Sequence, residues 1–145
     1  MKKHELEISN VIAEKLHPIE EILNLNVIAI NKLKTCHPSF QYDLKKYYPQ
    51  SWNIFDKKNR QLTYKVSIQN LKKGIKEGCY RKEINPEIIS KIFSEKIDVI
   101  FNSLAFEAIN VSFSDVYKEL INHHVLGIVN EKGRKYYLNF QKTTK

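Results

Sequence analysis

The segment Gly78-Cys79-Tyr80-Arg81-Lys82-Glu83-Ile84-Asn85-Pro86-Glu87 separates two predicted helices. Gly78 can adopt the left-handed conformation that ends a helix. Asn85 is a good N-cap, Pro86 suits the first helical position, and Glu87 complements the positive end of the helix dipole. This segment therefore predicts that one helix ends near Gly78 and that another begins at Pro86.

Hydrophobic residues recur at three- and four-residue steps on both sides of this segment, which is typical of amphipathic helices. Proline suits the first turn of a helix, and Ser112 with Asp115 resembles a capping box. We predict about six helices, over residues 4–16, 18–33, 40–47, 49–77, 86–104 and 112–128. The tail from residue 129 carries four apolar residues that could dock on the helices: Tyr136, Tyr137, Leu138 and Phe140. The pattern indicates an all-α fold.

The chain has 145 residues, of which 42% are hydrophobic and 28% are charged. This composition excludes disordered, collagen-like and disulfide-scaffold chains, and four glycines and four prolines are too few for a turn-rich β fold. We expect one domain over residues 1–145, with residues 1–3 and 141–145 disordered. No apolar run is long enough to span a membrane and no signal peptide is evident, so we expect a cytoplasmic protein without membrane contact.

The net charge is +8, and it is concentrated between Lys45 and Lys82. That stretch holds eleven Lys or Arg residues and two acidic ones. A basic stripe can bind nucleic acid, but it can equally be the solvated face of a helix. We favour the solvated face because no Gly-rich or RNP-type motif accompanies the charge.

The sequence contains no recognisable catalytic motif: GxSxG, a phosphate-binding loop, HExxH and GxGxxG are all absent. His123 and His124 are neighbours, so on a helix they point about 100° apart and make a poor chelating pair. Cys36 and Cys79 lie far apart without a CxxC motif and are expected to be plain thiols. We therefore expect no enzyme activity, no cofactor and no metal.

The predicted helices 86–104 and 112–128 are apolar over unusually wide arcs, roughly 220° and 180°, where one buried face needs about 100°. The simplest explanation of a second buried face is that a second copy of the chain packs on it, although the C-terminal tail could also cover it. We therefore predict a homodimer, with five residues at or near the seam: Ile92, Phe93, Ile100, Leu120 and His124.

Aromatic residues are concentrated between Phe40 and Tyr64. Tyrosine and tryptophan combine an apolar ring with a polar tip, as the lining of a ligand pocket requires, although ordinary core packing would use the same residues. We predict a pocket for a small, largely apolar or aromatic effector, lined by Ile22, Leu25, Ile28, Tyr42, Tyr47, Trp52, Phe55 and Tyr64.

Two segments resemble the C-terminal regulatory domain of TetR/AcrR-family transcriptional regulators. The first is Tyr42-Asp43-Leu44-Lys45-Lys46-Tyr47-Tyr48-Pro49-Gln50-Ser51-Trp52, which is similar to the middle of that domain. The second is Gly74-x3-Gly78-Cys79-Tyr80-Arg81-Lys82-Glu83-Ile84-Asn85-Pro86-Glu87, which is similar to the turn before the family's penultimate helix. The order of the predicted helices agrees as well, over about residues 4–128.

The resemblance implies a TetR C-terminal-domain-like helical bundle that dimerises through a four-helix bundle, made of residues 86–104 and 112–128 of each subunit. It implies an effector-binding and dimerisation domain of a transcriptional regulator. The family binds operator DNA through an N-terminal helix-turn-helix domain, which is missing from this chain because nothing before His4 can supply it. The alternatives are a stand-alone helical dimeric interaction module without a ligand, and a non-specific nucleic-acid binder that uses residues 45–82.

Overall fold

The computed structural model describes residues 2–35, 38–101, 106 and 109–143, with side chains described for residues 3–32, 42–96, 106 and 109–143. Within these residues the chain forms seven helices and no strand, which confirms the all-α prediction. The helices are α1 (Lys2–Ala13), α2 (Pro18–Thr35), α3 (Pro38–Tyr47), α4 (Pro49–Lys76), α5 (Pro86–Phe101), α6 (Phe113–Ile128) and α7 (Glu131–Thr143).

The start and stop signals at Gly78, Asn85 and Ser112 are confirmed, whereas α1 ends at Ala13 instead of residue 16 and α3 begins at Pro38 instead of residue 40. The backbone N–H of Ile88 donates to Oδ1 of Asn85 over 3.1 Å, so Asn85 caps α5. The backbone N–H of Asp115 donates to Oγ of Ser112 over 3.1 Å, so Ser112 caps α6. Gly78 follows α4 with a positive φ of 72°, where a residue with a side chain would be strained. Helix α5 is described to Phe101, and the predicted end at residue 104 lies outside the described residues.

Helix α7 is absent from the six helices that the sequence pattern predicts. Asn130 caps it, because its Oδ1 accepts the backbone N–H of Gly133 over 3.0 Å. Tyr137 is buried against the bundle, whereas the neighbouring Leu138 is exposed. The tail is therefore an amphipathic helix that docks through one face. Residues 2–3 and 141–143, which we expected to be disordered, are helical as well, while residues 1, 144 and 145 lie outside the described part.

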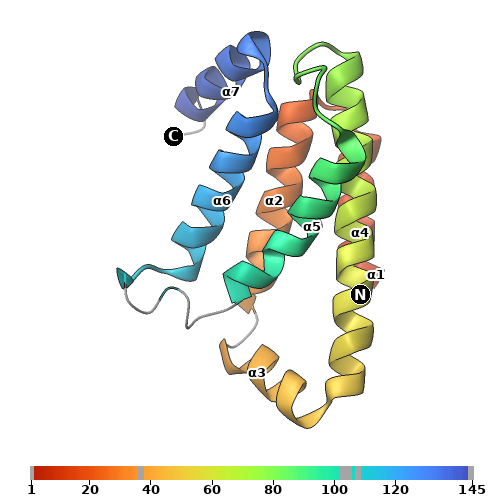
Figure 1. The fold of residues 1–145 in the computed structure, drawn as a ribbon, viewed down its shortest axis with the longest axis vertical. Coiled ribbons are helices and arrows are strands. Elements are labelled where there is room, and N and C mark those ends of the chain that lie inside the picture. Colours follow the sequence, from red (N-terminus) through yellow and green to blue (C-terminus); the bar gives the residue numbers. More distant parts are fainter. Residues whose placement is uncertain (1, 36–37, 102–105, 107–108, 144–145) are drawn as a thin grey trace.

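Helix α4 runs along the long axis of the molecule, and α5 packs against it over much of its length (Figure 1). Helices α2 and α6 lie beside this pair, α3 lies at one end of the molecule, and α7 lies towards the other (Figure 1). Small buried serines lie on both helices of this pair, Ser67 on α4 and Ser90 and Ser94 on α5.

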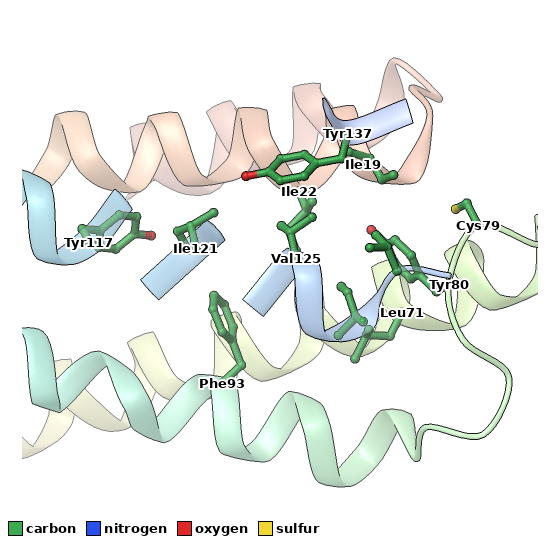
Figure 2. Close-up of a cluster of buried hydrophobic side chains, with 12 residues drawn as sticks. Ile19, Ile22, Leu71, Cys79, Tyr80, Phe93, Tyr117, Ile121, Val125 and Tyr137 are labelled. Carbon is green, nitrogen blue, oxygen red and sulfur yellow. The ribbon is translucent and has the colours of Figure 1, made fainter. Parts of the chain in front are cut away.

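The core is a cluster of side chains from five of the helices, α2, α4, α5, α6 and α7, and from two connecting segments (Figure 2). Phe93 of α5 points into this cluster towards α6, and Leu71 of α4 lies beside Tyr80 (Figure 2). The loop after α4 is fixed to the turn before α7, because Asn130 N–H donates to the carbonyl of Cys79 over 3.1 Å. None of the described helices has the length and apolar character needed to cross a membrane.

Candidate functional site

The aromatic segment predicted to line a pocket lies where α3 meets α4. Trp52 and Phe55 are half-buried on the first two turns of α4, with ring centroids 5.9 Å apart. Tyr42 and Tyr47 of α3 are 63% and 62% exposed, so their rings line the outside of this corner rather than its interior. Lys45 Nζ lies 4.7 Å from the centroid of the Trp52 ring, which gives the corner a basic outer layer.

The other predicted pocket residues are spread along α2 and α4. Ile22 is part of the buried core, while Leu25, Ile28 and Tyr64 are half-buried. Two cavities in the described part of the chain are lined by residues other than those predicted for the pocket. The pocket therefore stays a prediction.

One of these cavities, of about 470 Å³, lies at the joint between α1 and α2, beside α4. Its walls combine aliphatic and charged side chains: Ile12, Lys15, Glu21, Val66, Gln69, Lys73 and Glu77. The other, of about 570 Å³, lies between the loop after α4 and the start of α7. Its lining combines charged, polar and aliphatic residues: Arg81, Lys82, Glu83, Leu126, Val129, Asn130, Glu131 and Arg134.

A buried polar network fixes the joint between α1 and α2. Glu21 accepts hydrogen bonds from Asn70 Nδ2 over 2.9 Å and from Lys73 Nζ over 2.6 Å. Lys73 Nζ also donates to the carbonyl of Leu16, and Asn70 Nδ2 to that of Pro18. Because a buried charge is stable only when it is paired and hydrogen-bonded, this network holds the end of α1 and the start of α2 on α4.

Tyr80 extends the network to the loop after α4, because its hydroxyl donates to Oδ1 of Asn70 over 2.9 Å. Burial raises the pKa of Tyr80 far above its usual value, so the hydroxyl stays protonated and able to donate. The Tyr80 ring lies directly on Gly74, where a Cβ atom would come within 2.1 Å of the ring. The segment from Gly74 to Tyr80 is therefore built around this ring.

A second buried pair joins α2 to α6. The hydroxyl of Tyr117 donates to Oδ1 of Asn26 over 2.9 Å, and Nδ2 of Asn26 donates to the carbonyl of Ile22. Burial raises the pKa of Tyr117, which keeps its proton in place for this bond. No local sequence signal indicates this pairing, since the partners are 91 residues apart.

His124 lies in the interior, between α5 and α6. Its ring stacks on Phe93 with a centroid distance of 4.2 Å, and both side chains are buried within one chain. Of the other residues predicted for the seam, Ile92 is exposed and Leu120 is half-buried, while the side chain of Ile100 lies outside the described residues. Of the predicted seam residues with described side chains, Phe93 and His124 therefore lie in the interior, whereas Ile92 and Leu120 are accessible to a partner.

The basic stretch of residues 45–82 lies mainly on the surface of α3 and α4. Arg60 forms ion pairs with Asp56 and Glu95, and Lys72 Nζ lies 3.1 Å from a carboxylate oxygen of Glu87. In the part of the chain with described side chains, no group of three His, Cys, Asp or Glu residues is placed to hold a metal ion.

Comparison with known proteins gives one informative match. No family model matches the chain, and no curated protein matches its sequence. Among solved structures, the fold is similar to that of the ketosteroid transcriptional regulator KstR2 of Mycobacterium tuberculosis, with a TM-score of 0.58 and 15% sequence identity. The chain has a TetR-like fold. The match covers 88% of this chain and 66% of KstR2, so the chain spans slightly less than two thirds of that regulator's length.

The turn between Gly74 and Glu87 is recognisable from the sequence, but the polar network around Glu21 is not. The sequence marks Glu21 only as an acidic residue in a first helical turn, and its burial has no local signal. Asn70 offers one: it lies one turn beyond Val66 on the predicted apolar side of α4, where a polar residue needs a buried partner.

Proposed function

We propose that this chain is the effector-binding and dimerisation domain of a TetR-like transcriptional regulator, and that it senses a small, largely apolar molecule. The observation that carries the proposal is the TetR-like fold over 88% of the chain. The solved structure with the similar fold is that of a ketosteroid transcriptional regulator. A rigid apolar effector of comparable chemistry suits a chain whose core consists of aliphatic and aromatic side chains.

The half-buried aromatic residues support an effector site between α2 and α4. Trp52 and Phe55 present ring surface that neither helix covers completely, and Leu25 and Ile28 of α2 are half-buried as well. Apolar surface of this kind binds apolar ligands because its removal from water is favourable.

The joint between α1 and α2 supports a route from effector to DNA. In the proposed regulator α1 connects this domain to a DNA-binding domain, and Lys73 holds the link between α1 and α2 through the carbonyl of Leu16. An effector that binds one packing of α2 and α4 more tightly than another shifts the population between the packings, and α1 moves with them.

A fluorescent apolar probe tests the effector site. We expect N-phenyl-1-naphthylamine to bind the protein saturably, and Trp52→Ala to weaken this binding at least severalfold because one wall of the site is removed. Ile54→Ala is the matched control, since Ile54 lies on the same helix but is exposed. A protein that binds no probe would contradict effector sensing and would favour the interaction module.

Binding of nucleic acid by the basic stretch is the second candidate, favoured by exposed lysines around the corner of α3 and α4: Lys45, Lys46, Lys57 and Lys58. Such binding would not depend on the nucleic-acid sequence. Its affinity would fall steeply with added salt, because the binding is driven by the release of counterions from the phosphate backbone. A filter-binding titration at two salt concentrations distinguishes it from the proposed function.

A further inference from the structure

Three buried polar atoms have no hydrogen-bond partner within the described part of the chain: Ser67 Oγ, Ser90 Oγ and His124 Nε2. Ser90 is completely buried, and His124 is only 7% exposed. An unsatisfied buried polar group costs free energy, and such groups are rare in folded proteins, so each one requires an explanation.

The three atoms lie on three helices, α4, α5 and α6, and α5 packs against both of the others. The ion pairs Lys72–Glu87 and Arg60–Glu95 set the register of α4 against α5. In this register Ser67 of α4 and Ser90 of α5 lie between the two ion pairs, at about the same height along the helix axes. Phe93 follows Ser90 by one turn on the same face of α5. Since Phe93 stacks on His124, the unsatisfied nitrogen of α6 belongs to a ring that lies against the turn of α5 after Ser90.

His124 is a neutral imidazole in this region. Burial lowers its pKa to about 4, and the charged or titratable neighbours that act on it, Lys96 and His123, lower it further. A neutral imidazole nitrogen can donate or accept one hydrogen bond according to its tautomer. Hydroxyl and keto oxygens therefore match Nε2, whereas a carboxylate would be buried against an uncharged ring at a large cost.

We propose that the effector site between α2 and α4 extends through the core cluster, which includes Ile22 of α2, to α6, where His124 Nε2 is its polar anchor. The effector is then an apolar molecule with a hydroxyl or keto oxygen that pairs with this nitrogen. The proposal rests on the proposed function. Phe93 supplies an apolar surface against the imidazole, and Ile121 and Val125 of α6 add aliphatic surface beside it (Figure 2). Ser67 and Ser90 can pair with a second oxygen or with a water molecule that accompanies the ligand.

Probes with one carbon skeleton test the anchor. The affinities of 1-octanol, 2-octanone and n-octane are measured for the wild-type protein and for His124→Phe, which keeps the stacking on Phe93 but removes the nitrogen. We expect the affinity ratio of 1-octanol to n-octane to fall roughly threefold to tenfold in the variant, which corresponds to one net hydrogen bond. His123→Phe is the matched control, because His123 is exposed, and it should leave the ratio unchanged.

A direct readout on the wild-type protein keeps the test independent of how well the variant folds. The imidazole ¹⁵N signal of His124 Nε2 should shift when 1-octanol is added and stay in place with n-octane. If the probes bind but neither the ratio nor the signal changes, the effector site stands and His124 is not its anchor. If no probe binds, the proposed function fails together with this inference.

Discussion

Gly74 has no room for a side chain, because an added Cβ atom would lie 2.1 Å from the Tyr80 ring. The ring is buried and its hydroxyl is bonded to Asn70, so it cannot move aside without breaking that bond. We expect Gly74→Ala to lower the free energy of unfolding by about 1–3 kcal/mol, as overpacking of a core does. Urea denaturation followed by circular dichroism measures the change.

Gly127 is the control for this substitution, since it lies within α6 and nothing is within 4 Å of its added Cβ. Alanine has the higher helix propensity, so Gly127→Ala should raise the free energy of unfolding by up to about 1 kcal/mol. Equal effects of the two substitutions would show that the contact between Gly74 and Tyr80 does not constrain the fold.

The buried imidazole of His124 makes stability depend on pH. Burial lowers its pKa from the usual 6.5 to about 4 in the folded protein, so between these values the unfolded chain binds the proton more readily. The contribution of His124 is therefore complete above about pH 6.5, and up to about 3 kcal/mol is lost as the pH falls to 4.

Denaturation of the wild-type protein and of His124→Phe at pH 7 and pH 4 isolates this contribution, because the variant lacks the titrating group. The lowered pKa values of His4 and His17 act in both proteins and cancel in the difference. An identical loss of stability in the two proteins would place the acid sensitivity elsewhere.

Residue-scale prediction from the sequence succeeds where the signal is local. Asn85 and Ser112 cap helices through atoms only three residues away, and Gly78 ends α4 by its own backbone conformation. The partners of Glu21 and Asn26 lie 49 and 91 residues away along the chain, respectively, so no pattern of neighbouring residues could reveal them.

At the scale of elements, the joint between α1 and α2 depends on Lys73. Its ammonium group pairs with the buried carboxylate of Glu21, so Lys73→Met would leave that charge unpaired and cost about 3 kcal/mol. Hydrogen exchange should also increase around Leu16, whose carbonyl loses its donor. The double variant with Glu21→Gln should recover part of the stability, because the buried charge is removed.

Lys72→Met is the matched control, because the ion pair of Lys72 with Glu87 is exposed to solvent and is worth at most about 1 kcal/mol. Denaturation and hydrogen exchange of the two variants measure the difference. Comparable losses at both lysines would show that the Glu21–Lys73 pair contributes no more than a surface ion pair.

Element boundaries are predictable where proline or a capping residue marks them, as at Pro18, Pro49 and Pro86. Helix α7 begins after a capping residue too, Asn130, but its docking through the buried Tyr137 depends on residues far away in the sequence. The predicted pocket shows the same limit. Tyr42 and Tyr47 share the composition of a pocket lining, yet the direction in which α3 lies turns both rings outwards.

At the scale of the whole molecule, the exposed face of α5 is the strongest argument for assembly. Ile88 and Ile92 are 57% and 45% exposed, and they lie four residues apart on the same face of the helix. The predicted wide apolar arc is thus divided between an inner face, with Phe93 in the core, and an outer face of isoleucines. A second copy of the chain that packs its own α5 and α6 on this face would remove both isoleucines from water.

We expect the protein to be a dimer at tens of micromolar and Ile92→Asp to raise the dissociation constant at least roughly a hundredfold, because burial of an unpaired carboxylate costs several kcal/mol. Sedimentation equilibrium measures both. Ile54→Asp is the matched control: Ile54 is exposed as well, but it lies on α4 near α3, away from the proposed seam. If only the Ile54 variant dimerised more weakly, the dimer interface would lie at the corner of α3 and α4 instead. A monomeric wild-type protein would contradict the homodimer that the sequence predicts.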